Sequence, residues 1–219
     1  MTVVAVDGPV GSGKSTVARR VAARLGYVYL DTGAMYRAVG LLATEAGVRL
    51  DDEEAVVALA RSAGLRFDGN GHLYAGGRDV SAAIRTLEMG AAASRVSALP
   101  GVRAFLVAEQ RRLAGSADIV MEGRDIGTNV FPDAAVKVFL TARPEVRAAR
   151  RAAELREKGD DVDDAQVLAA LLERDRRDST RALAPLRKAA DAVELDTSEM
   201  TLDEVVTAVT GIARRQVGP

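Results

Sequence analysis

The chain of 219 residues lacks cysteine, contains a single histidine and has no long apolar run. Without cysteine it cannot form disulfides, thiolate metal sites or a cysteine nucleophile, and this fits a reducing compartment. No stretch approaches the roughly 18 consecutive apolar residues of a membrane span, and the N-terminal segment lacks the pattern of a secretory signal. We therefore expect a cytoplasmic protein that does not associate with membranes.

An excess of charge of one sign is also missing. Thirty basic residues stand against thirty-one acidic residues, which gives a net charge of -1. The total charge therefore gives no reason to expect a nucleic-acid partner, and any anion site must come from a local group of basic residues. Hydrophobic residues make up 48% of the chain, enough for one substantial core. No exposed apolar stripe is evident, so we expect a monomer.

Short β-branched runs alternate with longer helical patterns along the chain. The runs are residues 2–6, 27–30, 119–122, 136–140 and 192–195, and helical patterns cover residues 15–25 and about 144–158. Buried strands separated by helices are typical of a parallel sheet. We therefore expect an α/β fold with a five-stranded parallel sheet covered by helices on both faces.

One part of the chain interrupts this rhythm. Residues 64–80 contain short β-prone pieces separated by DGNG and GG, a pattern typical of hairpins. We expect residues 40–96 to form an inserted α+β subdomain, with helices at 52–63 and 81–98, and residues 1–39 and 97–219 to form the core. The single histidine, His72, falls in the hairpins, and we expect a surface turn residue there.

The segment GPVGSGKST, residues 8–16, lies between the first strand and the first helix. It fits the pattern G-x-x-x-x-G-K-[ST], in which glycines let backbone N–H groups face inward toward phosphates. Lys14 would reach the β and γ phosphates of ATP, and Ser15 would bind Mg²⁺. The alternative is a tight turn without a ligand. The residues expected to bind the nucleotide are Gly8, Pro9, Val10, Gly11, Ser12, Gly13, Lys14, Ser15 and Thr16.

Two further segments place charged residues after strands, at the edge where open α/β sheets bind ligands. In DTGAMYR, Arg37 could bind a second phosphate, although it could equally be a surface residue. In EGRDIGT, Arg124 suits a phosphate and Asp125 suits an amino group such as that of cytosine. Glu122 would act on Mg²⁺ through water, or else form an internal ion pair.

A third charged segment is ERDRRDSTRALAPL, residues 173–186. Arg174, Asp178 and Arg181 are separated by four and three residues, which places them on one face of a helix. They could therefore act together on a ligand. The alternative is an ordinary solvated helix face.

The motifs GPVGSGKST, LDTGAMYRA, EGRDIGT, VFPDA and ERDRRDSTRALAPL, in this order, resemble the bacterial cytidylate kinase family. The likeness covers nearly the whole chain. It implies a P-loop kinase fold with an enlarged monophosphate-binding insertion and a short lid at about residues 150–166. It also implies transfer of the γ-phosphoryl group of ATP to CMP or dCMP, with Mg²⁺ as cofactor.

The resemblance also implies roles for individual residues. Arg37 and Arg124 would bind the acceptor phosphate, while Ser94, Arg103 and Asp125 would surround the cytosine. The full acceptor set is Thr32, Tyr36, Arg37, Ser94, Arg103, Arg124, Asp125, Arg174, Asp178 and Arg181. Thr32 stands where some members of the family have serine, and Ser15 where some have glycine, so the metal role of Ser15 does not apply to every member.

The expected chemistry needs no general base, because a phosphate monoester is already largely ionised at neutral pH. Lys14 and Arg124 would stabilise the transferring group, and arginines of the lid helix (Arg147, Arg150 and Arg151) would close over it. Two alternatives stay open. One is a P-loop kinase for UMP, AMP, dTMP or shikimate, and the other is a nucleotide switch, for which the chain lacks an N-K-x-D stretch.

Overall fold

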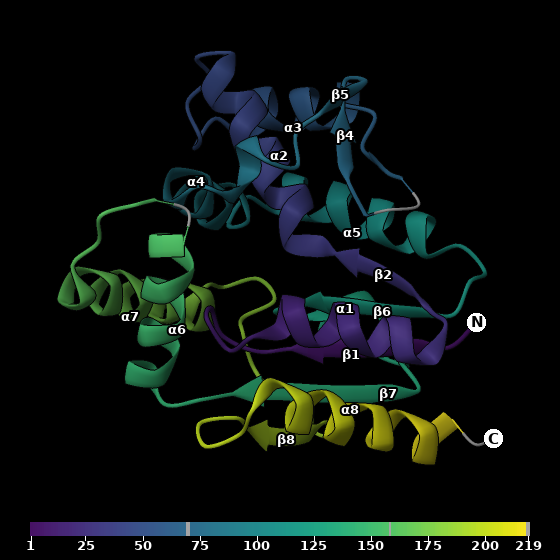
Figure 1. The fold of residues 1–219 in the computed structure, drawn as a ribbon. Helices are drawn as coiled ribbons and strands as arrows, with labels where there is room; N and C mark the ends of the chain where they lie inside the picture. The colour runs from purple at the N-terminus through teal and green to yellow at the C-terminus, as the bar shows by residue number, and fades with distance from the viewer. Residues whose placement is uncertain (69–70, 158, 218–219) are drawn as a thin grey trace. The chain divides into compact units, whose positions relative to one another are not determined.

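The computed structural model describes residues 1–68, 71–157 and 159–217. These residues form two compact units, the first built from residues 1–29 and 117–219 and the second from residues 30–116. Figure 1 shows the elements of both. None of the described helices is long and apolar enough to cross a membrane.

The first unit carries most of the parallel sheet. Its elements are β1 (Val3–Asp7), α1 (Lys14–Leu25), β6 (Ile119–Gly123), the π-helix η2 (Ile126–Val130), β7 (Val136–Thr141), α6 (Pro144–Glu157), α7 (Asp164–Thr180), β8 (Val193–Asp196) and α8 (Leu202–Val217). Strand β2 (Val28–Asp31) begins in this unit and ends in the second. The sheet has five strands, as predicted, and their order is β2-β6-β1-β7-β8.

The central strand β1 pairs in parallel with β6 and β7, and β7 pairs in parallel with β8. Every residue of β1 and β6 is buried, as expected for central strands covered on both faces. Because the strands are parallel, the segments that follow β1, β6 and β7 leave the sheet at the same edge. These segments contain the phosphate-loop motif, EGRDIGT and the start of α6.

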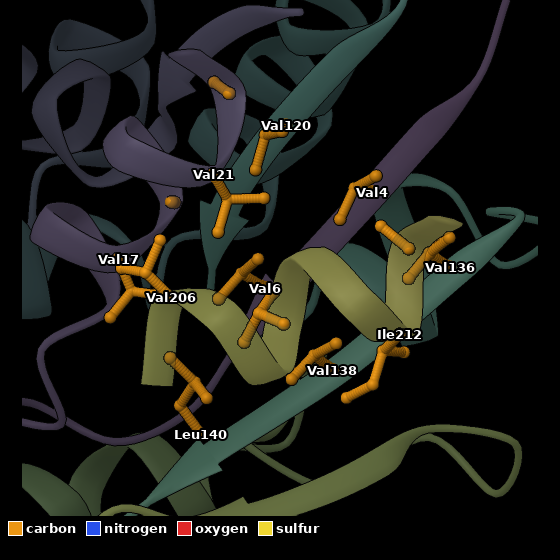
Figure 2. Close-up of a cluster of buried hydrophobic side chains, with 14 of the residues drawn as sticks. Val4, Val6, Val17, Val21, Val120, Val136, Val138, Leu140, Val206 and Ile212 are labelled. Carbon is orange, nitrogen blue, oxygen red and sulfur yellow. The ribbon is translucent and has the colours of Figure 1, made fainter. Parts of the chain in front are cut away.

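The main core lies between one face of the sheet and helices α1 and α8 (Figure 2). Val4 and Val6 of β1 and Val138 and Leu140 of β7 point into it, because alternate residues of a strand face the same side. Gly13 precedes helix α1 and Gly26 follows it as cap residues, and both adopt the left-handed conformation. A second, smaller cluster of Ala148, Ala152, Leu155, Val167 and Leu171 holds α6 against α7.

The second unit is mostly helical. It contains α2 (Thr32–Glu45), α3 (Glu53–Ser62), α4 (Leu87–Val96), α5 (Pro100–Ala114), the 3-10 helix η1 (Ala83–Arg85) and the strands β3 (Arg66–Phe67), β4 (Leu73–Ala75) and β5 (Arg78–Asp79). The three strands form an antiparallel sheet in the order β3-β4-β5, which confirms the predicted hairpins. Part of the DGNG turn, residues 69–70, lies outside the described residues, and His72 beside it is exposed, as expected.

The structure differs from the prediction in two places, which are the helix expected at 81–98 and the extent of the second unit. The helix expected at 81–98 is interrupted, because Thr86 leaves the helical conformation and its hydroxyl caps α4 by accepting from the amide of Met89. The helix expected at about 144–158 is confirmed at Pro144–Glu157, and residue 158 lies outside the described residues. The compact second unit is larger than the insertion expected at 40–96, because α2 packs on α4 and α5 packs on α3.

Candidate active site

The phosphate-loop segment joins the end of β1 to the start of α1, as its motif predicts. Two of its glycines are needed because other backbone lies close by. A Cβ atom at Gly8 would collide with the carbonyl oxygen of Leu140 in β7, and one at Gly11 would lie 2.9 Å from the carbonyl oxygen of Arg147 in α6. The loop is therefore held against β7 and α6, with its shape set before any ligand binds.

Lys14 is buried at the first position of α1. Its ammonium group donates to the carbonyl oxygen of Pro9 at 2.6 Å and to the hydroxyl of Ser12 at 3.3 Å. Burial, with the positive charges of Arg124 and Arg174, holds the pKa of Lys14 well below its usual value, and Glu122 and Asp7 oppose this only partly. An anion placed at the loop would relieve this repulsion between cations.

Asp7 ends β1 directly before the loop, and the sequence reasoning did not single it out. Its carboxylate is buried and accepts hydrogen bonds from the amides of Ile126 (2.9 Å) and Gly127 (2.8 Å) at the start of η2. Burial raises the pKa of Asp7 to about 6, and the negative charge of Asp125 adds to this, while the two amides and Lys14 oppose it. Asp7 thus fixes the segment that carries Arg124 and Asp125.

Glu122 lies buried in β6, where it accepts a hydrogen bond from the hydroxyl of Tyr29 at 2.7 Å. Its negative charge acts to raise the pKa of Lys14, so the two side chains are electrostatic neighbours. Glu122 therefore lies in the electrostatic surroundings of Lys14 at the phosphate loop.

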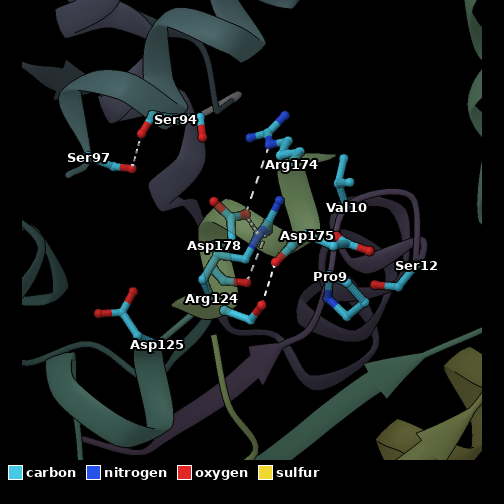
Figure 3. A network of polar contacts seen from close by, with 12 residues as sticks. Pro9, Val10, Ser12, Ser94, Ser97, Arg124, Asp125, Arg174, Asp175 and Asp178 are labelled. Carbon is cyan, nitrogen blue, oxygen red and sulfur yellow. Dashed lines mark hydrogen bonds and ion pairs between the residues drawn. The ribbon is translucent and has the colours of Figure 1, made fainter. Parts of the chain in front are cut away.

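Arg124, Arg174 and Asp178 form one network in the first unit (Figure 3). The Nε of Arg124 donates to Oδ2 of Asp178 at 3.0 Å, and the Nε of Arg174 lies 4.0 Å from the same oxygen. Burial alone would raise the pKa of Asp178, but Arg124, Arg174 and Arg181 hold it below its usual value. The network thus brings Arg124 of the EGRDIGT segment together with Arg174 and Asp178 of the ERDRRDSTRALAPL segment.

Arg181 does not lie on the helix face predicted for it. Helix α7 ends at Thr180, and Arg181 is the cap residue in an extended conformation. Pro185 follows closely, and helices usually end before a proline. The side chain still reaches the site, because its Nη2 lies 3.4 Å from Oδ1 of Asp125.

The three arginines expected at the lid lie in different surroundings. Arg147 is buried and donates to the carbonyl of Val10 in the phosphate loop at 3.0 Å and to Asp175 of α7 at 2.6 Å. Arg150 donates to the hydroxyl and carbonyl of Thr197, after β8. Arg151 pairs with Glu154 on its own helix. Of the three, only Arg147 contacts the phosphate loop among the described residues.

In the second unit, the residues expected at the acceptor site gather on α2, α4 and α5. Thr32 and Tyr36 lie on α2 near Arg37, whose Nη2 donates to Asp31 at 2.8 Å. Arg103 of α5 is buried, donates to the carbonyl of Ser97 at 3.4 Å and lies with its guanidinium 5.8 Å from the ring centre of Tyr36.

Ser94 lies one turn before Ser97 near the end of α4, where its carbonyl accepts a hydrogen bond from the Ser97 hydroxyl. The serine, arginine and tyrosine expected near the acceptor are thus all held by one unit.

The described residues contain no cluster of three or more histidines, aspartates or glutamates that could cage a metal ion. Ser15, at the start of α1, makes no hydrogen bond with the described residues through its hydroxyl and so stays available to a ligand. This donor set fits Mg²⁺ held mainly by nucleotide phosphates and water, which is the usual mode of Mg²⁺ at nucleotide sites.

The chain is similar to known proteins over nearly its whole length. A sequence model described as cytidylate kinase matches residues 4–215. A protein of Solibacter usitatus named cytidylate kinase is 49% identical over 217 residues, which cover 98% of this chain and 93% of that protein. One of Methylococcus capsulatus with the same name is 50% identical over 206 residues, which cover 93% of each chain.

Solved structures add support for the fold alone. Shikimate kinase from Bacteroides thetaiotaomicron is 13% identical, with a TM-score of 0.53 over 99% of this chain and 98% of that one. The fold of this chain is thus similar to that of a solved kinase structure. With the near-complete match to the family model and relatives at about half identity, this chain belongs to the cytidylate kinase family.

Proposed function

We propose that this protein transfers the γ-phosphoryl group of ATP to CMP or dCMP, giving CDP or dCDP and ADP. The observation that carries the proposal is the similarity, over nearly the full chain, to proteins named cytidylate kinase. The site supports phosphoryl transfer independently, because a buried lysine in a preformed loop lies near two arginines. Such a site compensates the negative charge of phosphates.

On the donor side, the backbone of residues 8–16 binds the phosphates of ATP, and Lys14 leaves its contacts with Pro9 and Ser12 to bind the β and γ oxygens. Ser15 would hold Mg²⁺ directly, and Glu122 would contribute through water. Bound Mg²⁺ would neutralise phosphate charge. Arg147 supports the loop by its bond to Val10, and Arg150 acts from the lid, residues 150–166.

On the acceptor side, the residues of the first unit have three roles. Arg124 and Arg174 bind the monophosphate, Asp178 accepts from the ribose hydroxyls, and Asp125 accepts from the amino group of cytosine. The ion pairs with Asp178 and Asp125 hold the arginines ready, so little ordering is needed when CMP arrives.

In the second unit, which includes the insertion at 40–96, Arg37 binds the monophosphate and Tyr36 with Thr32 lines the same part of the site. Ser94 accepts from the cytosine amino group and Arg103 donates to its ring acceptors. A site that hydrogen-bonds one edge of a base discriminates strongly, because the wrong base leaves buried polar groups unpaired.

No general base is assigned. The second pKa of a phosphate monoester is about 6, so the attacking oxygen of CMP is already largely an anion at neutral pH. The protein's residues then bind, orient and screen two anionic substrates, and closure of the lid excludes water that would otherwise hydrolyse ATP. We also propose that the enzyme acts in the cytoplasm, where its nucleotide substrates are found, and as a monomer.

A coupled assay of ADP release tests the function. Purified protein with ATP and Mg²⁺ is given CMP, dCMP, UMP, AMP or dTMP at equal concentration. We expect CMP or dCMP to have the highest kcat/KM. A clear preference for UMP, AMP or dTMP would contradict the cytosine assignment, and ATP hydrolysis that does not depend on any monophosphate would contradict transfer itself.

Changing Asp125 to Asn tests how the base is read. An amide can present its NH₂ toward the cytosine amino group, so we expect kcat/KM for CMP to fall by tens to hundreds of times, about 2–3 kcal/mol of lost discrimination. KM for ATP should change little. An unchanged preference for CMP over UMP would rule out Asp125 as the reader of the amino group.

A further inference from the structure

Asp31 organises a pair of arginines in the second unit. It ends β2 and caps α2, where its Oδ1 accepts from the amide of Ala34 at 2.9 Å. Its Oδ2 accepts from Nη2 of Arg37 at 2.8 Å and lies 3.1 Å from Nη1 of Arg85. Arg85 is the last residue of η1, just before the Thr86 cap of α4. One buried carboxylate thus holds two guanidinium groups from separate helices.

The cluster of Asp31, Arg37 and Arg85 carries more positive charge than its one carboxylate neutralises. Asp31 is already satisfied by Arg37 and the amide of Ala34, and two guanidinium groups on one carboxylate leave a net charge of +1. Burial would raise the pKa of Asp31, but Arg37 and Arg85 hold it below its usual value, so the carboxylate stays charged and both arginines stay fixed. The extra positive charge is available to an anion.

A second observation points to a missing ligand. The Nε of Arg37 is buried and makes no hydrogen bond with the described residues. A buried guanidinium donor without an acceptor is costly unless a ligand supplies one. Gly33 makes room here, because a Cβ atom at that position would lie 3.0 Å from Nη1 of Arg37 and 3.2 Å from Oδ1 of Asp31.

Arg85 is placed to share such an anion with Arg37. Its side chain is 38% exposed, and its ion pair with Asp31 is the only one it forms with the described residues, so most of its five donors are uncommitted. We propose that Arg85 is a further monophosphate-binding arginine, the second in this unit, which contacts the phosphate of the acceptor nucleotide alongside Arg37 and is positioned by Asp31. This proposal rests on the proposed function for the identity of the acceptor.

Binding of CMP and of cytidine, measured by calorimetry without ATP, tests this role. The two ligands differ only in the phosphate. In Arg85→Ala we expect the Kd for CMP to rise by about ten- to a hundred-fold, which is the usual effect of losing one hydrogen bond between charged groups. The Kd for cytidine should stay the same, because cytidine has no phosphate. Arg85→Lys keeps a charge but not the fork of donors, so its loss should be smaller.

Arg78→Ala is the matched control. Arg78 lies in the same unit and also pairs with one carboxylate, Glu45, but on the exposed surface. Its CMP affinity should equal that of the wild type. The two variants should have the same melting temperature, because Asp31 still accepts hydrogen bonds from Arg37 and from the amide of Ala34 in Arg85→Ala.

Two results would overturn the assignment. One is a loss of CMP affinity in Arg85→Ala no larger than in Arg78→Ala, and the other is an equal loss for CMP and cytidine, which would mean that Arg85 only shapes the unit. Turnover of CMP by the wild type judges the proposed function separately. A wild type that binds CMP more tightly than cytidine but does not phosphorylate it would fail that function, while the affinity ratio would still decide the role of Arg85.

Discussion

Lys14 and Asp7, at the two ends of the phosphate loop, are both charged groups in surroundings that disfavour their charge. Burial and neighbouring arginines lower the pKa of Lys14, and burial raises the pKa of Asp7 to about 6. In each case the folded protein favours the charged form less than the unfolded chain does. Strongly shifted pKa values of this kind are typical of functional sites.

Lys14→Met should therefore separate activity from stability. Methionine fills a similar volume without a charge, so we expect kcat with CMP to fall by about 10²–10³-fold while the free energy of unfolding at pH 7 stays equal or rises. Initial rates and urea unfolding of both proteins measure the two effects. A variant that is less stable but nearly as active would contradict the role of Lys14 as a phosphate clamp.

Asp7→Asn should change how stability depends on pH. Between about pH 4 and 6 the folded protein keeps the proton of Asp7 while the unfolded chain has lost it, so this group makes stability fall as pH rises through that window. A rise from 3.8 to about 6 corresponds to a loss of about 3 kcal/mol by pH 7.

Urea unfolding of wild type and Asp7→Asn at several pH values between 4.5 and 7.5 tests this. The wild type should lose stability relative to the variant as pH rises to about 6, and the difference should then level off. Carboxylates with lowered pKa, such as Asp31 and Asp178, act in both proteins and cancel in the difference. A difference that does not vary with pH would show that Asp7 titrates normally.

At the residue scale, sequence could identify motif residues but not their partners. The spacing of GPVGSGKST was sufficient to predict the loop and its strand and helix context. The ion pairs of Arg124 with Asp178 and of Arg85 with Asp31 join residues far apart in the chain, which no local pattern reveals. Asp7 could have been noticed as a carboxylate at the end of a buried strand directly before the loop, and Asp31 as the acid that opens DTGAMYR.

At the element scale, the pair α6–α7 has its own small core, separate from that of the sheet. Ala148, Ala152 and Leu155 of α6 meet Val167 and Leu171 of α7. A pair of helices held by so few buried side chains can open locally without unfolding the rest. The lid proposed at residues 150–166 would require such local opening.

Leu155→Ala should weaken this pair selectively. The fully buried leucine leaves a cavity, which costs about 2–5 kcal/mol. We expect hydrogen exchange to quicken in residues 144–157 and 164–180 and to stay slow in β1 and β7. Leu172→Ala is the control, because Leu172 lies on the same pair of helices but is 47% exposed. Equal exchange in the two variants would show that the pair is not held by this cluster.

The helices and strands were predicted correctly where the apolar residues recur regularly, and incorrectly where a cap or a contact from another strand determines the local structure. The five strands and the helices after Gly13 and Pro144 follow from apolar runs and from the glycine and proline beside them. The π-helix at Ile126–Val130 has no sequence signal, because Asp7 stabilises its start from another strand. The interruption at Thr86 depends on one hydroxyl that caps α4.

At the scale of the whole molecule, near-zero net charge coexists with concentrated positive groups. The chain carries -1 overall, yet Arg124, Arg174 and Lys14 lie together in one unit, and Arg37 and Arg85 share Asp31 in the other. Attraction of anionic substrates is therefore local rather than global. Interactions of this kind are weakened by salt when solvent reaches them.

KM for CMP should accordingly rise several-fold between 50 and 300 mM potassium chloride, while the Kd for uncharged cytidine stays nearly constant. Steady-state rates at fixed, saturating ATP and Mg²⁺ measure the first, and calorimetry the second. A KM for CMP that is independent of salt would mean that the arginines contribute little to substrate capture.

The overall architecture was predictable because alternating strands and helices admit few arrangements, and a parallel sheet with short connections is the simplest. The extent of the second unit could not be predicted, because it depends on which helices pack together. Residues 30–116 form one compact body through α2 with α4 and α3 with α5, whereas the composition of the chain changes only within 64–80.

The close packing of the phosphate loop also limits how the gene can vary. At Gly8 any side chain meets the backbone of β7, so a complete substitution library should recover glycine alone there. At Gly13 a side chain would meet nothing within 4 Å, and only the left-handed backbone, with φ of 83°, restricts the choice. Asparagine, which adopts that conformation more readily than other residues, should be the commonest survivor at position 13. Two glycines of one motif thus differ in mutational tolerance.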